Sequence, residues 1–421
     1  MTSQVVLLNG FGVAIASDSA MTLGESRTYD TAEKVFPIGG VHPIAVLHSG
    51  SVFLHEYPFQ VLVSEWSQTL PKDPLPTVEA YLQGFLFWLT RLAPSVSQKN
   101  QLDQYGVYLN AALKIAYTET KKIWDAGTTN PFAVAKETIK AKTQDMMTWK
   151  KIQNSDADFV KGLMSKNEEW NQVRVEFWFN DWPSDAELNQ IAMEYAFQYL
   201  QFGFWAGQAT LAFCGFGKDQ ILPAYSRVDI NGIIGNRCLW REGDNYSFNS
   251  RESDSSFSIF SLGQTDTIFE FLKGVDTQVV DLAVEVAFEA SDIGEELLKN
   301  EFMRRIDTHP NKQEFSQIIE ASLADEGRIN EVASRVEKLT NERFDQHMED
   351  TRLERLRKVV RGIPPATLAS VAQSLISIVP LRQALSGELG TVGGPIDVAT
   401  ITRADGFKWV KHKSVGHEFN F

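Results

Sequence analysis

The sequence contains little cysteine and no recognisable metal-binding pattern. Cys214 and Cys238 are the only cysteines among 421 residues, and they lack the spacing of a zinc-binding pair. The seven histidines form no HExxH motif. These absences argue against a disulfide framework and against a zinc site. We therefore expect no metal or other cofactor, and two unreactive thiols in a reducing compartment.

Positive charge is also in deficit. The chain has 40 Lys and Arg against 54 Asp and Glu, which gives a formal net charge of −14. Proteins that bind nucleic acid through its phosphates need a basic face, so we expect no nucleic-acid partner. The basic run at 352–361 is interrupted by Leu353, Glu354 and further apolar residues, which is typical of a solvated helix surface.

Long uninterrupted hydrophobic runs are missing as well. The most apolar late segment, 363–385, is punctuated by Ser, Gln, Arg and Pro, so we expect no membrane span. The apolar segment 5–16 has no positive residue before it and is broken by Asn9-Gly10, a strong hairpin signal. A hairpin is therefore favoured over a signal peptide. Together with the cysteine usage, this predicts a cytoplasmic protein.

What the sequence does contain is an alternation of β-rich and helical blocks. Hydrophobic residues make up 43% of the chain, enough for a sizeable core. Short strands, separated by turn signals, are predicted at 5–8, 13–16, 34–38, 43–47, 208–216, 220–229, 257–262, 396–402 and 406–410. The intervening segments have helical periodicity. This order predicts an α+β fold in which two sheets are sandwiched between helical layers.

Two helical segments differ from the rest in composition. The segment 98–205 is rich in Trp and Phe, whereas 291–362 carries dense charge of both signs. We interpret both as insertions into a core built from 1–97, 206–290 and 363–421. The aromatic insertion suits burial against a neighbour or over an active site, although an ordinary intramolecular core would explain it equally. The charged insertion suits solvent.

The N-terminal spacing of three polar residues carries the chemistry. Thr2 is followed after sixteen positions by Asp18 and after thirty-two by Lys34. This block resembles, without a gap, the start of proteasome β subunits and of the related bacterial ATP-dependent peptidase. Segments 34–38 and 44–50, the pair 211–219 and 223–232, and the closing segment 393–407 resemble further strands of that family. The resemblance spans roughly half of the chain and excludes both insertions.

The resemblance implies a four-layer αββα sandwich of the N-terminal-nucleophile hydrolase type. It also implies that Thr2, exposed by removal of Met1, attacks an amide bond, and that the backbone N–H of Gly50 binds the oxyanion. Aligning Gly50 requires a short insertion after Lys34, because a gap-free count ends on His48. The specificity pocket of the family would be lined here by Met21, Ala32 and Phe36, an uncharged set that favours apolar substrates.

The chemistry of these residues can be argued independently. A threonine hydroxyl needs a base within hydrogen-bonding reach, and the α-amine of Thr2, with a pKa of about 7.7–8.0, would supply one. Lys34, as a fixed cation, would keep that amine neutral and lower the pKa of the hydroxyl. Asp18 would pair with Lys34 and orient it.

Three positions depart from the family pattern. Ala20 replaces a side chain that is often long and polar. The supporting serine should lie within Ser261-Leu262-Gly263, with Ser261 as the candidate. The supporting acid before the closing hairpin has only Glu388 as a substitute.

Three functions are compatible with these residues. The first is a threonine-type peptidase that acts on peptide substrates through an acyl-enzyme inside a self-assembled ring, with an unfoldase as a further partner. The second is a small-molecule amidohydrolase with the same nucleophile. The third is a catalytically inactive, proteasome-like scaffold protein. A homo-oligomer is expected from the first and third, whereas the second could act as a monomer or dimer.

Overall fold

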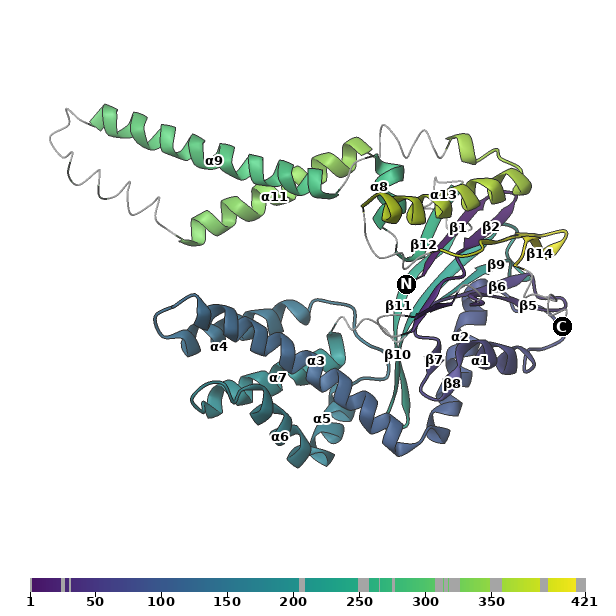
Figure 1. Ribbon diagram of the computed structural model, residues 1–421, viewed down its shortest axis with the longest axis horizontal. Helices are drawn as coiled ribbons and strands as arrows, with labels where there is room; N and C mark the ends of the chain where they lie inside the picture. Colours follow the sequence, from purple (N-terminus) through teal and green to yellow (C-terminus); the bar gives the residue numbers. More distant parts are fainter. Residues whose placement is uncertain are drawn as a thin grey trace. The chain divides into compact units, whose positions relative to one another are not determined.

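The computed structural model describes residues 2–23, 27–29, 32–203, 209–248, 257–264, 266–274, 277–306, 313, 317, 326–348, 358–386 and 393–413. The chain divides into two compact units, Met1–Gln264 with Pro364–Phe421, and Thr265–Ile363. The fold is mixed α+β, with two five-stranded antiparallel sheets in the first unit (Figure 1). The α+β class predicted from the sequence is therefore confirmed.

The first sheet joins the two ends of the chain. Its strand order is β12 (Phe257–Gly263), β1 (Ser3–Asn9), β2 (Gly12–Ser17), β13 (Asp397–Thr402) and β14 (Gly406–Lys411). β1 and β2 form the expected hairpin, but the loop residues are Gly10 and Phe11, because Asn9 pairs with Gly12. The predicted strands at both ends of the chain are thus confirmed.

The second sheet is built from strands that lie between β2 and β12 in the chain. Its order is β11 (Arg237–Ser247), β10 (Ala224–Ile234), β9 (Ala209–Gly215), β6 (Ile44–Gly50) and β5 (Val35–Ile38). Strand β11 was not predicted. The hairpin turn that creates it is Gly235-Asn236, where both residues have positive φ, as a two-residue type I′ turn requires. The Asn231-Gly232 pair lies instead within β10, at a register shift.

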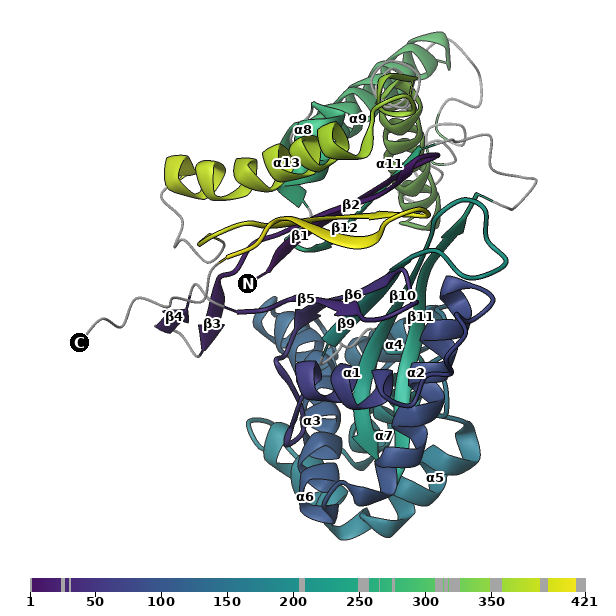
Figure 2. The same cartoon turned by 90° about the vertical axis from the view of Figure 1, so that its right-hand side faces the viewer.

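Apolar side chains of both sheets share one buried cluster, which includes Val6, Leu8, Val13 and Ile15 of the first sheet and Ala45, Leu47, Ala212 and Cys214 of the second. The second sheet also shares a core with helices α1 (Phe59–Ser67) and α2 (Val78–Leu92). Helix α13 (Pro365–Ser386) contacts β1, β2 and β13. Figure 2 shows α13 alongside the first sheet, and α1 and α2 alongside the second.

Helix α13 is the one helix among the described residues that is long and apolar enough to cross a membrane, over Pro365–Leu385. The polar residues of this segment led us to expect no membrane span, whereas its length and composition alone do permit one. Leu368, Ala372 and Ile376 are fully buried. Their contacts with the first sheet account for the apolar character of the helix.

Five helices occupy the aromatic-rich segment, and they belong to the same unit as the sheets. They are α3 (Gln98–Asp125), α4 (Pro131–Met146), α5 (Ala157–Lys166), α6 (Glu168–Trp178) and α7 (Ala186–Phe202). They build a core of their own, and Trp170, Trp178 and Trp182 pack against it. Most of the aromatic content is therefore explained by packing within the chain, although Phe177 and Trp149 are exposed.

The second unit is helical. It contains α8 (Asp266–Lys273), α9 (Thr277–Ile306) and α11 (Glu326–Met348), and α9 contacts α11. It begins at Thr265 rather than at 291, so that α8 and the first turns of α9 belong with the charged helices and not with the sheets.

The remaining described elements of the first unit are the short strands β3 (Met21–Leu23), β4 (Arg27–Tyr29), β7 (Phe53–Leu54) and β8 (Tyr57–Pro58) and the turn of 3-10 helix η1 (Ala93–Ser95).

Candidate active site

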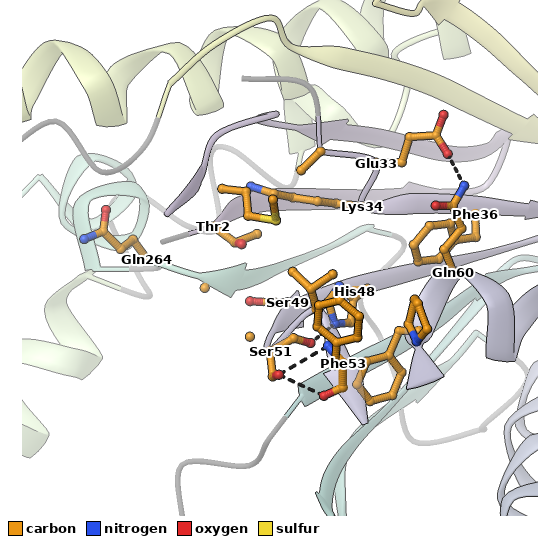
Figure 3. Close-up of a pocket in the computed structure, with 17 residues that line it drawn as sticks. Thr2, Glu33, Lys34, Phe36, His48, Ser49, Ser51, Phe53, Gln60 and Gln264 are labelled. Atoms are coloured by element: carbon orange, nitrogen blue, oxygen red, sulfur yellow. Dashed lines mark hydrogen bonds between the residues drawn. The ribbon is translucent and has the colours of Figure 1, made fainter. Parts of the chain in front are cut away.

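A cavity of about 810 Å³ lies in the first unit and is lined by most of the residues singled out from the sequence. Those lining residues are Thr2, Lys34, Gly50, Met21, Ala32 and Phe36. Figure 3 shows the Lys34 side chain running along the wall towards Thr2. Residues that are up to 48 positions apart in the chain thus face one cavity.

Asp18 lies behind this wall and holds Lys34. Its Oδ1 accepts hydrogen bonds from Lys34 Nζ at 2.7 Å and from the Ser3 backbone N–H at 2.9 Å. Lys34 Nζ also donates to the carbonyl oxygen of Ala20 at 2.6 Å. The loss of a long polar side chain at position 20 therefore leaves a backbone contact in place. The ion pair predicted from the spacing is present and is almost completely buried, with 6% and 1% of the two side chains exposed.

Local strand pairing explains how these groups meet. The β1–β2 hairpin brings the end of β2 back to the start of β1, where the Asp18 N–H donates to the Ser3 carbonyl at 3.1 Å. Lys34 directly precedes β5 of the second sheet. Its long side chain crosses from the second sheet to the first, so the ion pair connects the two sheets beside Thr2.

Burial dominates the electrostatics of Lys34. Removal from water lowers the pKa of its ammonium, Asp18 opposes that shift, and the positive charge of Lys413 adds to it. Asp397 acts in the opposite sense to Lys413. Burial therefore has the largest effect on the pKa of Lys34, and Lys413 and Asp397 act on it in addition to Asp18.

The structure distinguishes the two candidates for the oxyanion donor. The His48 backbone N–H donates to the Lys34 carbonyl at 2.9 Å, so it is already engaged. Gly50 ends β6, faces the cavity and has a φ of +98°, a backbone conformation that favours glycine. Gly50, reached by allowing a short insertion, therefore fits the donor role better than His48.

His48 contributes to the cavity wall in another way. Its ring stacks on Phe59 with centroids 4.9 Å apart, and Nε2 is 2.7 Å from the Ser51 carbonyl oxygen. Burial lowers the pKa of His48 to about 4. The imidazole is therefore neutral near pH 7 and acts as part of an uncharged surface.

Thr2 is held by the chain that follows β12. The Gln264 N–H donates to the Thr2 carbonyl at 2.7 Å. Gly263 has a φ of +83°, and a Cβ at this position would lie 1.8 Å from the Thr2 carbonyl oxygen. Glycine is therefore required for the close approach of these two backbones.

Of the two predicted supporting residues, Ser261 lies within the described part of the chain. Ser261 pairs with Val5 across β12 and β1 and does not line the cavity. Its buried hydroxyl has no hydrogen-bond partner among the described residues. Glu388 lies outside the described residues. Gln383 of α13 instead reaches this region, where its Nε2 donates to Gln264 Oε1 at 2.8 Å.

Several polar lining residues were not identified from the sequence, namely Glu33, Ser49, Ser51, Gln60 and Gln264. Glu33 is the most important of them, because the predicted specificity set of Met21, Ala32 and Phe36 carried no charge. The Glu33 carboxylate accepts a hydrogen bond from Gln60 Nε2 at 2.7 Å. Its position next to Lys34 was visible in the sequence, but nothing in the pattern indicated which way its side chain would point.

The remaining reactive groups provide no alternative centre in the described part of the chain. No group of three or more His, Cys, Asp or Glu residues there could hold a metal ion. Cys214 and Cys238 are unpaired and buried, and burial raises the pKa of the Cys238 thiol to about 12.

No protein-family model matches the chain, and no significant match occurs among curated proteins. The geometry of the cavity therefore carries the functional argument.

Proposed function

We propose that the protein is a threonine-type peptidase or amidohydrolase of the N-terminal-nucleophile class, with Thr2 as the nucleophile. The observation that carries this proposal is the buried Asp18–Lys34 ion pair beside Thr2 in the wall of one cavity. The contacts of α13, the two sheets, α1 and α2 support a four-layer αββα arrangement of the first unit.

The proposed reaction requires the free α-amine of Thr2, and hence removal of Met1. The amine takes the proton of the Thr2 hydroxyl as Oγ1 attacks the carbonyl carbon of the substrate. It then passes this proton to the leaving nitrogen as the C–N bond breaks, which leaves an acyl ester on Thr2. Water hydrolyses the ester with the same amine as base, and the free hydroxyl is restored.

The neighbouring groups have distinct roles in this scheme. The Lys34 ammonium disfavours protonation of the nearby amine and stabilises negative charge that develops on Oγ1. Asp18 fixes the position of Lys34 and offsets the cost of burying its charge. The Gly50 N–H is proposed to stabilise the oxyanion of the tetrahedral intermediate.

The cavity favours an apolar group on the acyl side of the scissile bond. Met21, Ala32, Phe36 and Phe59 contribute apolar surface, and the neutral imidazole of His48 adds no charge. Glu33 is the one carboxylate among the described lining residues, and it is exposed and accepts a hydrogen bond from Gln60. We therefore place it at the rim and not in the apolar subsite.

Peptides and small-molecule amides are the two candidate classes of substrate, and the assembly state of the protein distinguishes between them. A ring with peptide substrates, served by an unfoldase, follows from the resemblance. A small-molecule amidohydrolase is favoured by the cavity volume of about 810 Å³, which lies within the range of small-molecule sites, about 300–1,000 Å³. Light scattering should show a multi-subunit particle for the peptidase. A monomer that shows no concentration dependence would favour the small-molecule enzyme instead.

Intact-mass analysis before and after exposure to a β-lactone or epoxyketone probe tests the mechanism directly. We expect loss of the Met1 mass and addition of one probe molecule to wild type, with no addition to Thr2→Ala. Quantitative retention of Met1 in protein that still hydrolyses amides would rule out the α-amine mechanism. Absence of both processing and labelling would favour a catalytically inactive scaffold.

A further inference from the structure

A second buried ion pair lies close to the candidate active site. Lys413, just after β14, pairs through Nζ with Asp397 Oδ2, and its backbone N–H donates to Asp397 Oδ1 at 2.8 Å. Only 3% of each side chain is exposed. His412 Nδ1 is 3.1 Å from the same Oδ1. Two charges removed from water in this way represent a substantial desolvation cost, which calls for an explanation beyond stability.

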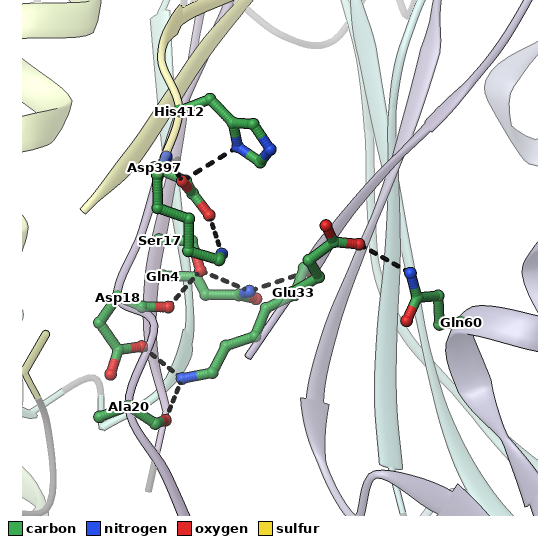
Figure 4. A network of polar contacts seen from close by, with 10 residues as sticks. Gln4, Ser17, Asp18, Ala20, Glu33, Gln60, Asp397 and His412 are labelled. Carbon is green, nitrogen blue, oxygen red and sulfur yellow. Dashed lines mark hydrogen bonds and ion pairs between the residues drawn. The ribbon is translucent and has the colours of Figure 1, made fainter. Parts of the chain in front are cut away.

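Strand register places this pair on the side of the first sheet that faces Lys34. Asp397 is the cross-strand partner of Ser17, and Ser17 is the partner of Gln4. Side chains of directly paired residues lie on the same face of a sheet. Gln4 Nε2 donates to Ser17 Oγ at 3.0 Å and to the Lys34 carbonyl at 3.2 Å (Figure 4). Asp397 and Lys34 therefore lie on opposite sides of a short polar bridge.

We propose that Asp397 and Lys413 form a positioning pair for the candidate catalytic Lys34, and that the end of the described chain thereby sets the electrostatic potential at Thr2. Each lysine faces a carboxylate of its own, Asp18 for Lys34 and Asp397 for Lys413, and the four charges compensate one another within one buried region. Neither Asp397 nor Lys413 lines the cavity. They act through Lys34 and do not touch substrate.

The other charged groups near Lys34 are accounted for. His48 faces it from β6 and is neutral because burial lowers its pKa to about 4. Glu33 is exposed and directed to Gln60. His412 reaches Asp397 and not Lys34. The charges that act on the Lys34 ammonium are those of Asp18 and Asp397, which raise its pKa, and of Lys413, which lowers it.

The sign of each influence gives a test that does not depend on catalysis. Lys413→Met removes a like charge and leaves the Asp397 carboxylate without its lysine partner, so the pKa of Lys34 should rise. Asp397→Asn leaves the Lys413 cation without its partner, so the pKa of Lys34 should fall. Shifts of about half a unit to one unit are expected, at or below the lower end of the ~1–3 units that a directly adjacent charge causes. Each is measurable by NMR titration of 13C-labelled lysine, with the Lys34 signal assigned from its loss in Lys34→Arg.

Lys413→Arg and the neutral pair Asp397→Asn/Lys413→Met are the matched controls. Both should keep the Lys34 pKa near that of wild type, because the balance of charge at this position is retained. A purely structural role predicts no such dependence on sign. Shifts of the two single variants in the same direction, or no shift in either, would overturn the proposal. If one single variant does not fold, the other still gives a signed result.

The catalytic consequence rests on the proposed function and is measured separately. In Lys413→Met the pKa of the Thr2 amine should rise with that of Lys34, so the acid limb of the kcat/KM profile should move to higher pH. Below that limb, activity should fall by about threefold to tenfold. Lys413→Arg should restore the profile. A shifted Lys34 pKa in a protein without hydrolytic activity would uphold the positioning pair and reject the proposed hydrolase. Hydrolysis with an unchanged pH profile in both single variants would uphold the hydrolase and reject the positioning pair.

Discussion

Lys34 joins the two sheets of the first unit, because its ammonium lies 2.7 Å from Asp18 Oδ1 while its backbone leads into the opposite sheet. Both side chains of this ion pair are buried. Any change that removes one member leaves the other as an isolated charge between the sheets. Stability and the candidate chemistry are therefore coupled at this position.

Replacement of Thr2 by Ala should abolish amide hydrolysis and leave the fold intact. The side chain lies at the cavity wall, and the contact from Gln264 is made to the Thr2 backbone, which alanine retains. Thr2→Ser should keep measurable activity because it keeps a hydroxyl. Turnover of an apolar fluorogenic peptide and thermal unfolding check both statements, and activity of Thr2→Ala equal to that of wild type would remove Thr2 from the mechanism.

Lys34→Met should abolish activity and also lower the free energy of unfolding by about 3–5 kcal/mol, the usual effect of leaving one member of a buried ion pair alone. The double variant Asp18→Asn/Lys34→Met should regain much of that stability but no activity. Asp18→Asn alone should retain more activity than Lys34→Met. Denaturant titration and kinetics separate these effects. Equal hydrolysis by Lys34→Met and wild type would show that the cation is dispensable.

Gly263→Ala should impair the site through the backbone. The added Cβ would collide with the Thr2 carbonyl, and the φ of +83° is unfavourable for alanine. We expect destabilisation by more than about 1 kcal/mol and a marked loss of kcat. Gly39→Ala is the matched control, because nothing lies within 4 Å of a Cβ there. Equal stability and equal kcat in the two variants would show that the close approach of Gly263 to Thr2 does not matter for function.

His48 should make stability depend on pH. Its pKa is lowered from 6.5 to about 4 by burial, so between these values the unfolded state binds more protons than the folded state. The contribution is complete above about pH 6.5 and is lost as the pH falls towards 4, up to about 3 kcal/mol in total. His48→Gln should show a smaller stability difference between pH 7.5 and pH 4.5. An unchanged difference would mean that His48 is not buried in its neutral form.

Substrates with an apolar residue on the acyl side should be cleaved best. Basic and acidic substrates should be poorer, because the subsite of Met21, Ala32 and Phe36 is uncharged. Glu33→Gln should leave the preference for apolar over acidic substrates largely unchanged, since the carboxylate lies at the rim. A fluorogenic panel measures this. A wild-type preference for basic substrates that disappears in Glu33→Gln would instead place Glu33 inside the specificity pocket.

The sequence was most informative where a pattern is local. Turn signals and apolar alternation located β1, β2, β5 and β6 closely, because these depend on neighbouring residues. Strand β11 was missed because its Arg, Glu and Asp residues do not alternate clearly with apolar ones, and its position depends on pairing with β10. The Asp18–Lys34 pair could be predicted because the spacing of Thr2, Asp18 and Lys34 matches the resembled family without a gap.

Long-range contacts were beyond the reach of such patterns. Nothing near Asp397 or Lys413 in the sequence indicates that they pair in a buried region next to Lys34. The β13–β14 hairpin brings the two residues together, and the pairing of β13 with β2, far apart in the chain, places them near Lys34. The role of Gln264 was likewise hidden, because it depends on β12 lying beside β1.

The pairing of β2 with β13 has a consequence for biosynthesis. Ser17 and Asp397 are 380 positions apart, yet they are neighbours in one sheet. At translation rates of about 5–20 residues per second, roughly 20 to 80 seconds separate the emergence of these two strands from the ribosome. During that time the first hairpin lacks one of its partners, and Lys413 has not been made. Asp18 and Lys34 are thus translated long before Asp397 and Lys413, so the full set of charges around Lys34 is present only after β13 and β14 have emerged.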